Sequence, residues 1–129
     1  MATRKAQNAR KQAGKTKAAH RKATGGKKKA VAGDPVKVDS KHYTVECENN
    51  RVRVLRIRYG PRELSVMHRH PAAVAVFLTD AHARFTFPDG KTEEQNARAG
   101  EVAAYPAGDH LPENLSDGPL ELVLVELKR

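Results

Sequence analysis

Two histidines that stand two positions apart, His68 and His70, are the residues whose type and spacing most directly predict chemistry in this sequence. On one β-strand their side chains would leave the same face about 7 Å apart along the backbone, so both imidazoles could reach a single ion. Neutral imidazole is a ligand for zinc, iron, copper and nickel. Two other interpretations stay open: the rings line a pocket that binds a ligand without a metal, or they only hydrogen-bond to backbone carbonyls.

The segment that carries these histidines is predicted to be a strand that starts at Leu64 and ends at His70. Leu64 and Val66 alternate in phase with His68 and His70. If the two aliphatic side chains face the core, both histidines enter the interior of the sheet as well. Arg69 belongs to the other phase and is expected to face water.

The rest of the chain beyond residue 33 also has the pattern of short strands. Apolar and polar residues alternate, or form brief apolar runs, between turns rich in Gly, Pro and Asn, and no helix of about 10 residues is indicated. This spacing predicts an all-β protein of seven or eight strands, an antiparallel sandwich or barrel. The other expected strands cover residues 42–47, 51–59, 72–79, 82–87, 91–98, 101–105 and 120–127.

Several side chains are assigned to the core or to the surface by the same alternation. The inward phase of residues 51–59 changes at Val54 and Leu55, which indicates a β-bulge there. Cys47 lies on an apolar phase and is expected to be an inert buried thiol. Three arginines of the second strand are expected to face water: Arg53, Arg56 and Arg58.

Two further groups of ionisable residues are not expected to form a site. His82 should point outward beside Arg84, because both lie on the polar phase of their strand. Glu93 and Glu94 are adjacent, so on a strand they face opposite sides and cannot act together as an acid and a base on one substrate.

Charge divides the chain into two parts. Residues 1–33 hold 11 of the 24 Lys and Arg residues and no acidic residue, which leaves 13 bases against 15 acids in residues 34–129. We expect residues 1–33 to be a disordered Lys/Ala-rich basic tail, because they hold almost nothing that could form a core, and residues 34–129 to be one folded domain. The tail could contact nucleic acid or another polyanion without sequence preference. The alternative is an extension that only increases solubility.

Composition excludes or disfavours several classes of protein. No run approaches the roughly 20 apolar residues of a membrane span, and the basic start lacks the apolar segment of a secretory signal. The single cysteine cannot form an internal disulfide. We therefore expect a cytoplasmic protein with no membrane partner. The sequence has no Gly-rich phosphate loop, no Gly-x-Ser-x-Gly turn and no Cys-x-x-Cys motif.

Two segments together resemble the motifs of the cupin family, which are small barrels of the double-stranded β-helix type. The first family motif is a glycine, His-x-His and a glutamate four or five residues later, and residues 60–70 resemble its first part. The resemblance spans roughly residues 38–128 and implies a cupin-like antiparallel β-barrel or jelly roll. The second motif is matched in order by Gly100, Pro106, Gly108, His110 and Asn114.

The match to these motifs is incomplete. The glutamate position falls at Val74 or Ala75, so that ligand is missing, and His110 comes one residue earlier than in the family. The resemblance then implies a metal site of three histidines, with His110 on a turn beside His68 and His70. Its cofactor would be a divalent transition metal (Fe, Zn, Mn, Cu or Ni). Some cupin-type thiol dioxygenases work with three histidines and no carboxylate, so iron chemistry stays open.

Three functions are compatible with these features. The first is a small cupin whose metal site acts on or binds a small molecule, as a dioxygenase or an isomerase. The second is a non-catalytic cupin that binds a small ligand, and the third is a nucleic-acid-associated accessory protein that acts through its basic tail. Whether the chain is an enzyme stays open. A homodimer is compatible with residues 120–127, which are apolar on both faces of their strand.

Overall fold

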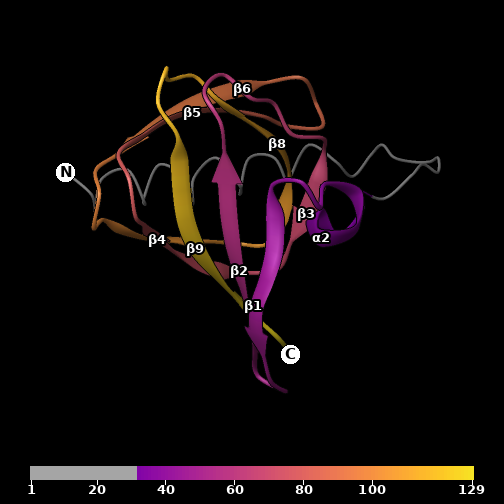
Figure 1. The fold of residues 1–129 in the computed structure, drawn as a ribbon. Helices are drawn as coiled ribbons and strands as arrows, with labels where there is room; N and C mark the ends of the chain where they lie inside the picture. Colours follow the sequence, from indigo (N-terminus) through magenta and orange to yellow (C-terminus); the bar gives the residue numbers. More distant parts are fainter. Residues whose placement is uncertain (1–31) are drawn as a thin grey trace.

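Residues 32–129 are described by the computed structural model and form nine strands and one short helical turn (Figure 1). Residues 1–31, most of the predicted basic tail, lie outside the described residues. The helical turn α2 (Pro35–Val38) is capped by Asp34, whose carboxylate accepts a hydrogen bond from the amide of Val36. No helix in residues 32–129 is long and apolar enough to cross a membrane. The strands are β1 (Tyr43–Glu48), β2 (Val52–Tyr59), β3 (His68–His70), β4 (Ala73–Phe77), β5 (Ala81–Thr86), β6 (Thr92–Ala97), β7 (Val102–Tyr105), β8 (Gly108–Asn114) and β9 (Leu120–Leu127).

The strands form two antiparallel sheets with the core between them. The larger sheet has the order β1-β2-β9-β4-β7, and the smaller has the order β3-β8-β5-β6. Several neighbours in each sheet are far apart in the chain, so the chain passes repeatedly from one sheet to the other, as in a jelly roll (Figure 1). The predicted fold class, an all-β antiparallel barrel or jelly roll, is confirmed.

Alternate residues of each strand build the core. In β2, Leu55, Ile57 and Tyr59 are buried, whereas Arg58 between them is exposed. Many inward positions on the other strands hold only alanine, which fills little volume, and this leaves space between the sheets. These buried alanines are Ala73, Ala75, Ala81, Ala83, Ala97 and Ala103.

The strand predicted from Leu64 to His70 is much shorter in the structure. Only His68–His70 form β3, and the side chains of Leu64 and Val66 are 56% and 44% exposed. Both histidines are buried, as predicted, but the alternation with aliphatic neighbours is not the reason. The rings of His68 and His70 instead contact Tyr43 of β1, in the facing sheet, with centroids 4.8 and 5.8 Å apart.

The irregularity predicted at Val54 and Leu55 lies on the neighbouring strand. β2 pairs with β9 without interruption, whereas β1 has an extra residue between Val45 and Cys47, opposite Leu55 and Val54. β1 is an edge strand, where a bulge disrupts hydrogen bonds on one side only. Cys47 is exposed on this edge, so the prediction of a buried thiol is wrong.

Candidate metal centre

The pairing of β3 with β8 brings the three predicted histidines together. The register places His68 directly opposite His110 and His70 opposite Gly108. Paired residues share a face of the sheet, as do residues two apart on a strand, so all three imidazoles project from one face. Their ring centroids are 4.7 to 5.2 Å apart, and one ligand nitrogen from each residue lies within 4.8 Å of the other two. His110 is on a strand rather than on the predicted turn.

Two of the three rings have a buried nitrogen with no hydrogen-bond partner in the described residues. His68 donates from Nδ1 to the carbonyl of Val66 at 2.8 Å, which leaves a lone pair on Nε2. That Nε2 atom, and Nε2 of His110, are buried and unpartnered. Buried polar atoms are almost always satisfied in folded proteins, so two unsatisfied nitrogens in one cluster of histidines fit a bound metal ion.

Burial keeps two of the rings neutral at physiological pH. The pKa of His68 is lowered to about 4, mainly by burial and in part by the neighbouring His70. Burial also lowers the pKa of His110 well below its usual range, with smaller contributions from His70 and His68. A neutral imidazole has the free lone pair that a metal ligand requires, so both rings are available for coordination near pH 7.

A buried carboxylate that the sequence analysis did not single out contacts the third histidine. Glu126, on β9, is 2% exposed, and its Oε2 lies 2.6 Å from Nδ1 of His70. Its Oε1 accepts from the guanidinium of Arg53, which also forms two hydrogen bonds with Asp34. Arg53 was predicted to face water and is instead largely buried in this contact. Glu126 follows Leu120, Leu122 and Leu124 in phase on β9. A charged residue at the end of this inward-facing series was the feature of the sequence that could have identified it.

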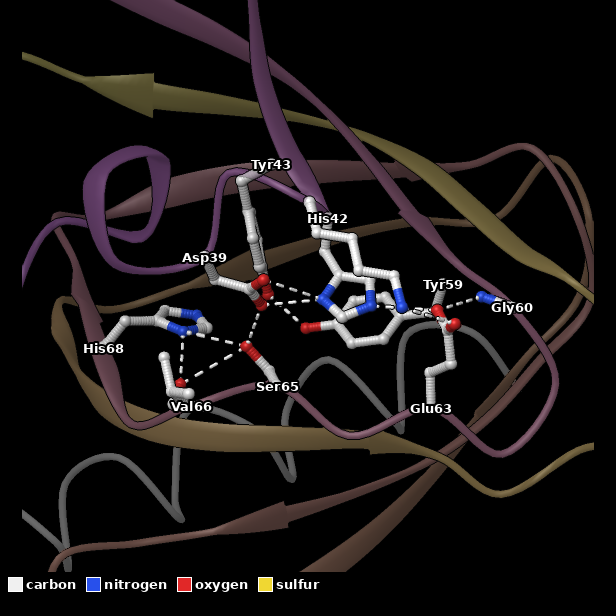
Figure 2. Close-up of polar contacts among 10 residues, drawn as sticks. Asp39, His42, Tyr43, Tyr59, Gly60, Glu63, Ser65, Val66 and His68 are labelled. Carbon is white, nitrogen blue, oxygen red and sulfur yellow. Dashed lines mark hydrogen bonds and ion pairs between the residues drawn. The ribbon is translucent and has the colours of Figure 1, made fainter.

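A second polar network reaches His68, and Figure 2 shows it. His42 contacts Glu63 through Nε2 at 2.9 Å and Asp39 through Nδ1 at 2.7 Å. Ser65 donates to the same Asp39 carboxylate at 2.5 Å, and its hydroxyl lies 3.4 Å from Nδ1 of His68. The segment before β1 and the loop before β3 are therefore joined next to a predicted metal ligand.

A cavity of about 250 Å³ lies between the sheets, and His70 and His110 form part of its wall. Most of its lining is apolar, and Phe85 stacks on the ring of His110 with centroids 5.0 Å apart. Arg69 also lies in the wall and is ion-paired with Asp109 at 2.8 Å. The acidic residues of the lining are Glu93, Asp109 and Glu113.

The remaining ionisable residues lie largely where alternation predicted. The imidazole of His82 is 42% exposed, points outward and contacts Glu94 at 2.9 Å. Arg69 is also half exposed at its guanidinium, as expected. Glu93 lines the cavity while Glu94 faces solvent, so the two carboxylates lie on opposite sides of β6.

No protein-family model matches this sequence, and no curated protein matches it. Solved structures do match. A cupin domain from Bordetella pertussis Tohama I is 27% identical with a TM-score of 0.64, over 81% of this chain and 100% of that chain. The chain has the cupin fold. A double-stranded β-helix protein from Klebsiella pneumoniae (22% identical, TM-score 0.54, 66% of this chain and 74% of that one) shows the same fold. So does a cupin superfamily protein from Desulfitobacterium hafniense DCB-2 (14% identical, TM-score 0.52, 67% and 76%).

The cupin fold explains the two motifs that led to it. Asn114, from the second motif, is fully buried and donates from its amide to the carbonyl of Gly60, from the first, at 2.9 Å. The family's glutamate would fall at Val74 or Ala75 on β4, and neither side chain has an atom that can bind a metal. In this chain the three histidines therefore stand without a carboxylate from the first motif.

Proposed function

We propose that this chain is a metal-binding small cupin in which His68, His70 and His110 hold a divalent transition-metal ion and a small molecule binds beside it. The observation that carries the proposal is the pair of buried, unpartnered nitrogens on His68 and His110 within one cluster of three rings. Nitrogen ligands suit iron, zinc, copper and nickel, and manganese stays among the candidates. Three protein ligands leave coordination positions for water or substrate.

The chemistry that such an ion supplies is polarisation of a bound oxygen or nitrogen atom and, for a redox-active metal, electron transfer. The protein's own contribution is to fix the donor rings on a pair of strands and to keep two of them, His68 and His110, neutral by burial. A dioxygenase or an isomerase activity is consistent with this arrangement, and we propose a metal-dependent activity of one of these two kinds.

We further propose that the part of the small molecule that lies in the cavity away from the metal is uncharged and largely apolar. The cavity wall is mostly apolar, and its arginine, Arg69, is already ion-paired with Asp109. Glu113, also in the wall, is ion-paired with Arg84 at 3.4 Å. A carboxylate in this part of the cavity would lose its hydration and compete with Asp109 for Arg69, whereas a neutral group would not.

Elemental analysis of the purified protein tests the metal site. Wild type should take up one equivalent of metal when incubated with iron, zinc, manganese, copper or nickel, and a double variant, His68→Ala with His70→Ala, should take up none. His82→Ala removes an exposed histidine and serves as the matched control with full uptake. A wild-type protein that binds none of the five metals refutes the proposal.

Calorimetric titration with benzamide and benzoate, which have similar shapes and differ in charge, tests the ligand class. In the metal-free protein, where no bound ion attracts the carboxylate, we expect benzamide to bind at least about tenfold more tightly than benzoate, a difference of about 1.4 kcal/mol. Equal or tighter binding of benzoate to the metal-free protein, or binding of neither, would overturn the ligand class. The metal-loaded protein is titrated in parallel, because a benzamide affinity that metal leaves unchanged would favour the alternative function, a cupin that binds its ligand without a metal.

Two partner proposals from the sequence remain. Nucleic-acid contact depends on residues 1–33, and salt-sensitive retention on DNA or RNA should be lost when this segment is deleted. A homodimer would be formed by a second copy of the chain, and sedimentation equilibrium measures it directly.

A further inference from the structure

The ligands of the predicted metal site do not neutralise the charge of a divalent ion. Three neutral histidines leave the two positive charges of a divalent ion uncompensated, and β4 offers only Val74 and Ala75 where a carboxylate ligand would fall. Burying an uncompensated charge is costly, so a buried carboxylate close to the site has a direct energetic consequence.

Glu126 is that carboxylate, and its position follows from the sheet pairing. β9 lies beside β4, and Glu126 is paired with Ala73, three residues after His70. The 2.6 Å contact joins Oε2 to Nδ1 of His70, so the ring donates from Nδ1 and keeps the Nε2 lone pair free. A histidine that ligates a metal through one nitrogen usually donates from the other to such a group.

The other side of the Glu126 carboxylate is held by a fixed cation. Arg53 contacts Oε1 through Nε at 2.9 Å and through a terminal nitrogen at 2.8 Å. Asp34 accepts from both terminal nitrogens of the same guanidinium at 2.9 Å. Glu126 is therefore engaged at both oxygens and cannot move toward the ion without breaking these contacts.

We propose that Glu126 is a positioning residue of the metal site. It contacts His70 and not the ion, and in this way it supplies the negative charge that the missing carboxylate ligand would have supplied. It fixes the tautomer and orientation of His70 and raises the basicity of its Nε2. Arg53 and Asp34 hold Glu126 in place, so the segment just before α2 takes part in the site although it lies outside both motifs. This inference rests on the proposed three-histidine site.

Glu126→Gln keeps the shape of the side chain and removes its charge. The oxygen of the new amide would satisfy Arg53, which turns the NH2 group toward Nδ1 of His70 and favours the tautomer with a proton on Nε2. We expect the affinity for Co²⁺, measured by competition with a chromophoric chelator, to fall by about tenfold or more. The visible absorption bands of bound Co²⁺ should shift, which a change in stability alone would not cause.

A double variant, Arg53→Gln with Glu126→Gln, keeps the inference testable if the single variant does not fold. It also removes the Arg53 cation, which would otherwise be buried beside an uncharged residue 126. It should also bind Co²⁺ at least about threefold more weakly than wild type, since the charge near His70 is still absent. Glu94→Gln makes the same change at the exposed carboxylate that contacts His82 and should leave affinity and spectrum unchanged.

The outcomes separate this inference from the proposed function. If wild type binds no metal, the proposed function fails and this inference fails with it. If wild type binds Co²⁺ and the folded Glu126 variants bind it within about twofold, or give the wild-type spectrum, Glu126 has no positioning role and the three-histidine site stands. Weaker binding with a shifted spectrum, in the Glu126 variants alone, supports the inference.

Discussion

His68 and His110 stand directly opposite each other on two antiparallel strands, with ring centroids 4.9 Å apart and ring planes at 89°. Each ring has a buried Nε2 atom without a partner among residues 32–129. The pair shows how the fold joins two separate motifs in one possible coordination site, because β3 carries two of the three histidines and β8 carries the third.

The metal-free protein should lose stability as the pH falls from neutral. An unfolded histidine titrates near its ordinary pKa of 6.5, whereas burial holds the pKa of His68 at about 4 in the folded state. The unfolded chain therefore binds more protons in this window, and the free energy of unfolding decreases from about pH 6.5 downward until the folded pKa is reached. We expect a loss on the order of 2 kcal/mol between about pH 7 and pH 5.

Urea unfolding at the two pH values measures this loss. His110, with its lowered pKa, acts in the same direction. His82→Gln, at an exposed histidine, should show the same decrease as wild type. Equal stability at both pH values would contradict the prediction.

Asp39→Asn should destabilise the protein. The amide replaces a buried carboxylate that accepts from both His42 and Ser65, as Figure 2 shows, so at least one of these contacts is lost. Losing the charged acceptor of two buried donors costs about 3 kcal/mol. Ser65→Ala removes one hydroxyl and should cost only about 1 kcal/mol. Chemical denaturation of the metal-free variants gives both values, and a cost below that of Ser65→Ala for the Asp39 variant would refute the prediction.

Ala83→Leu should fill part of the cavity without disturbing the histidines. Ala83 is buried and lines the cavity on β5, and the small side chains at inward positions leave room for three more carbon atoms. Added burial favours the folded state by about 1 to 2 kcal/mol unless the new side chain is strained. We expect the midpoint of thermal unfolding to rise, metal uptake to be unchanged and benzamide binding to be lost. Retained benzamide binding would mean that the ligand lies elsewhere.

Cys47 should react with a thiol reagent in the folded protein. It lies exposed on the edge strand β1, so the reagent can reach it without any unfolding. Ellman's reagent in native buffer should modify one thiol per chain at a rate within about threefold of that in urea. Strong protection in native buffer would indicate that a second copy of the chain, or another partner, covers this face.

The sequence was sufficient for the features that depend on neighbouring residues. Side-chain alternation along a strand is a property of the local backbone, so β9 was predicted with its observed bounds, and the outward position of His82 was also correct. The spacing of His68 and His70 likewise required only that the two lie on one strand. The motif residues from Gly100 to Asn114 indicated the cupin fold because they occur in a fixed order.

Tertiary structure decided the contacts between segments that are distant in the chain. Glu126 meets His70 only because β9 lies next to β4, and the alternation within β9 says nothing about which strand it will join. The burial of the histidines without their aliphatic neighbours has the same origin: the rings of His68 and His70 pack against Tyr43 of the facing sheet, while Leu64 precedes the strand in an irregular segment. Strand register and partner choice depend on packing over the whole sheet, which a local periodicity of two residues cannot specify.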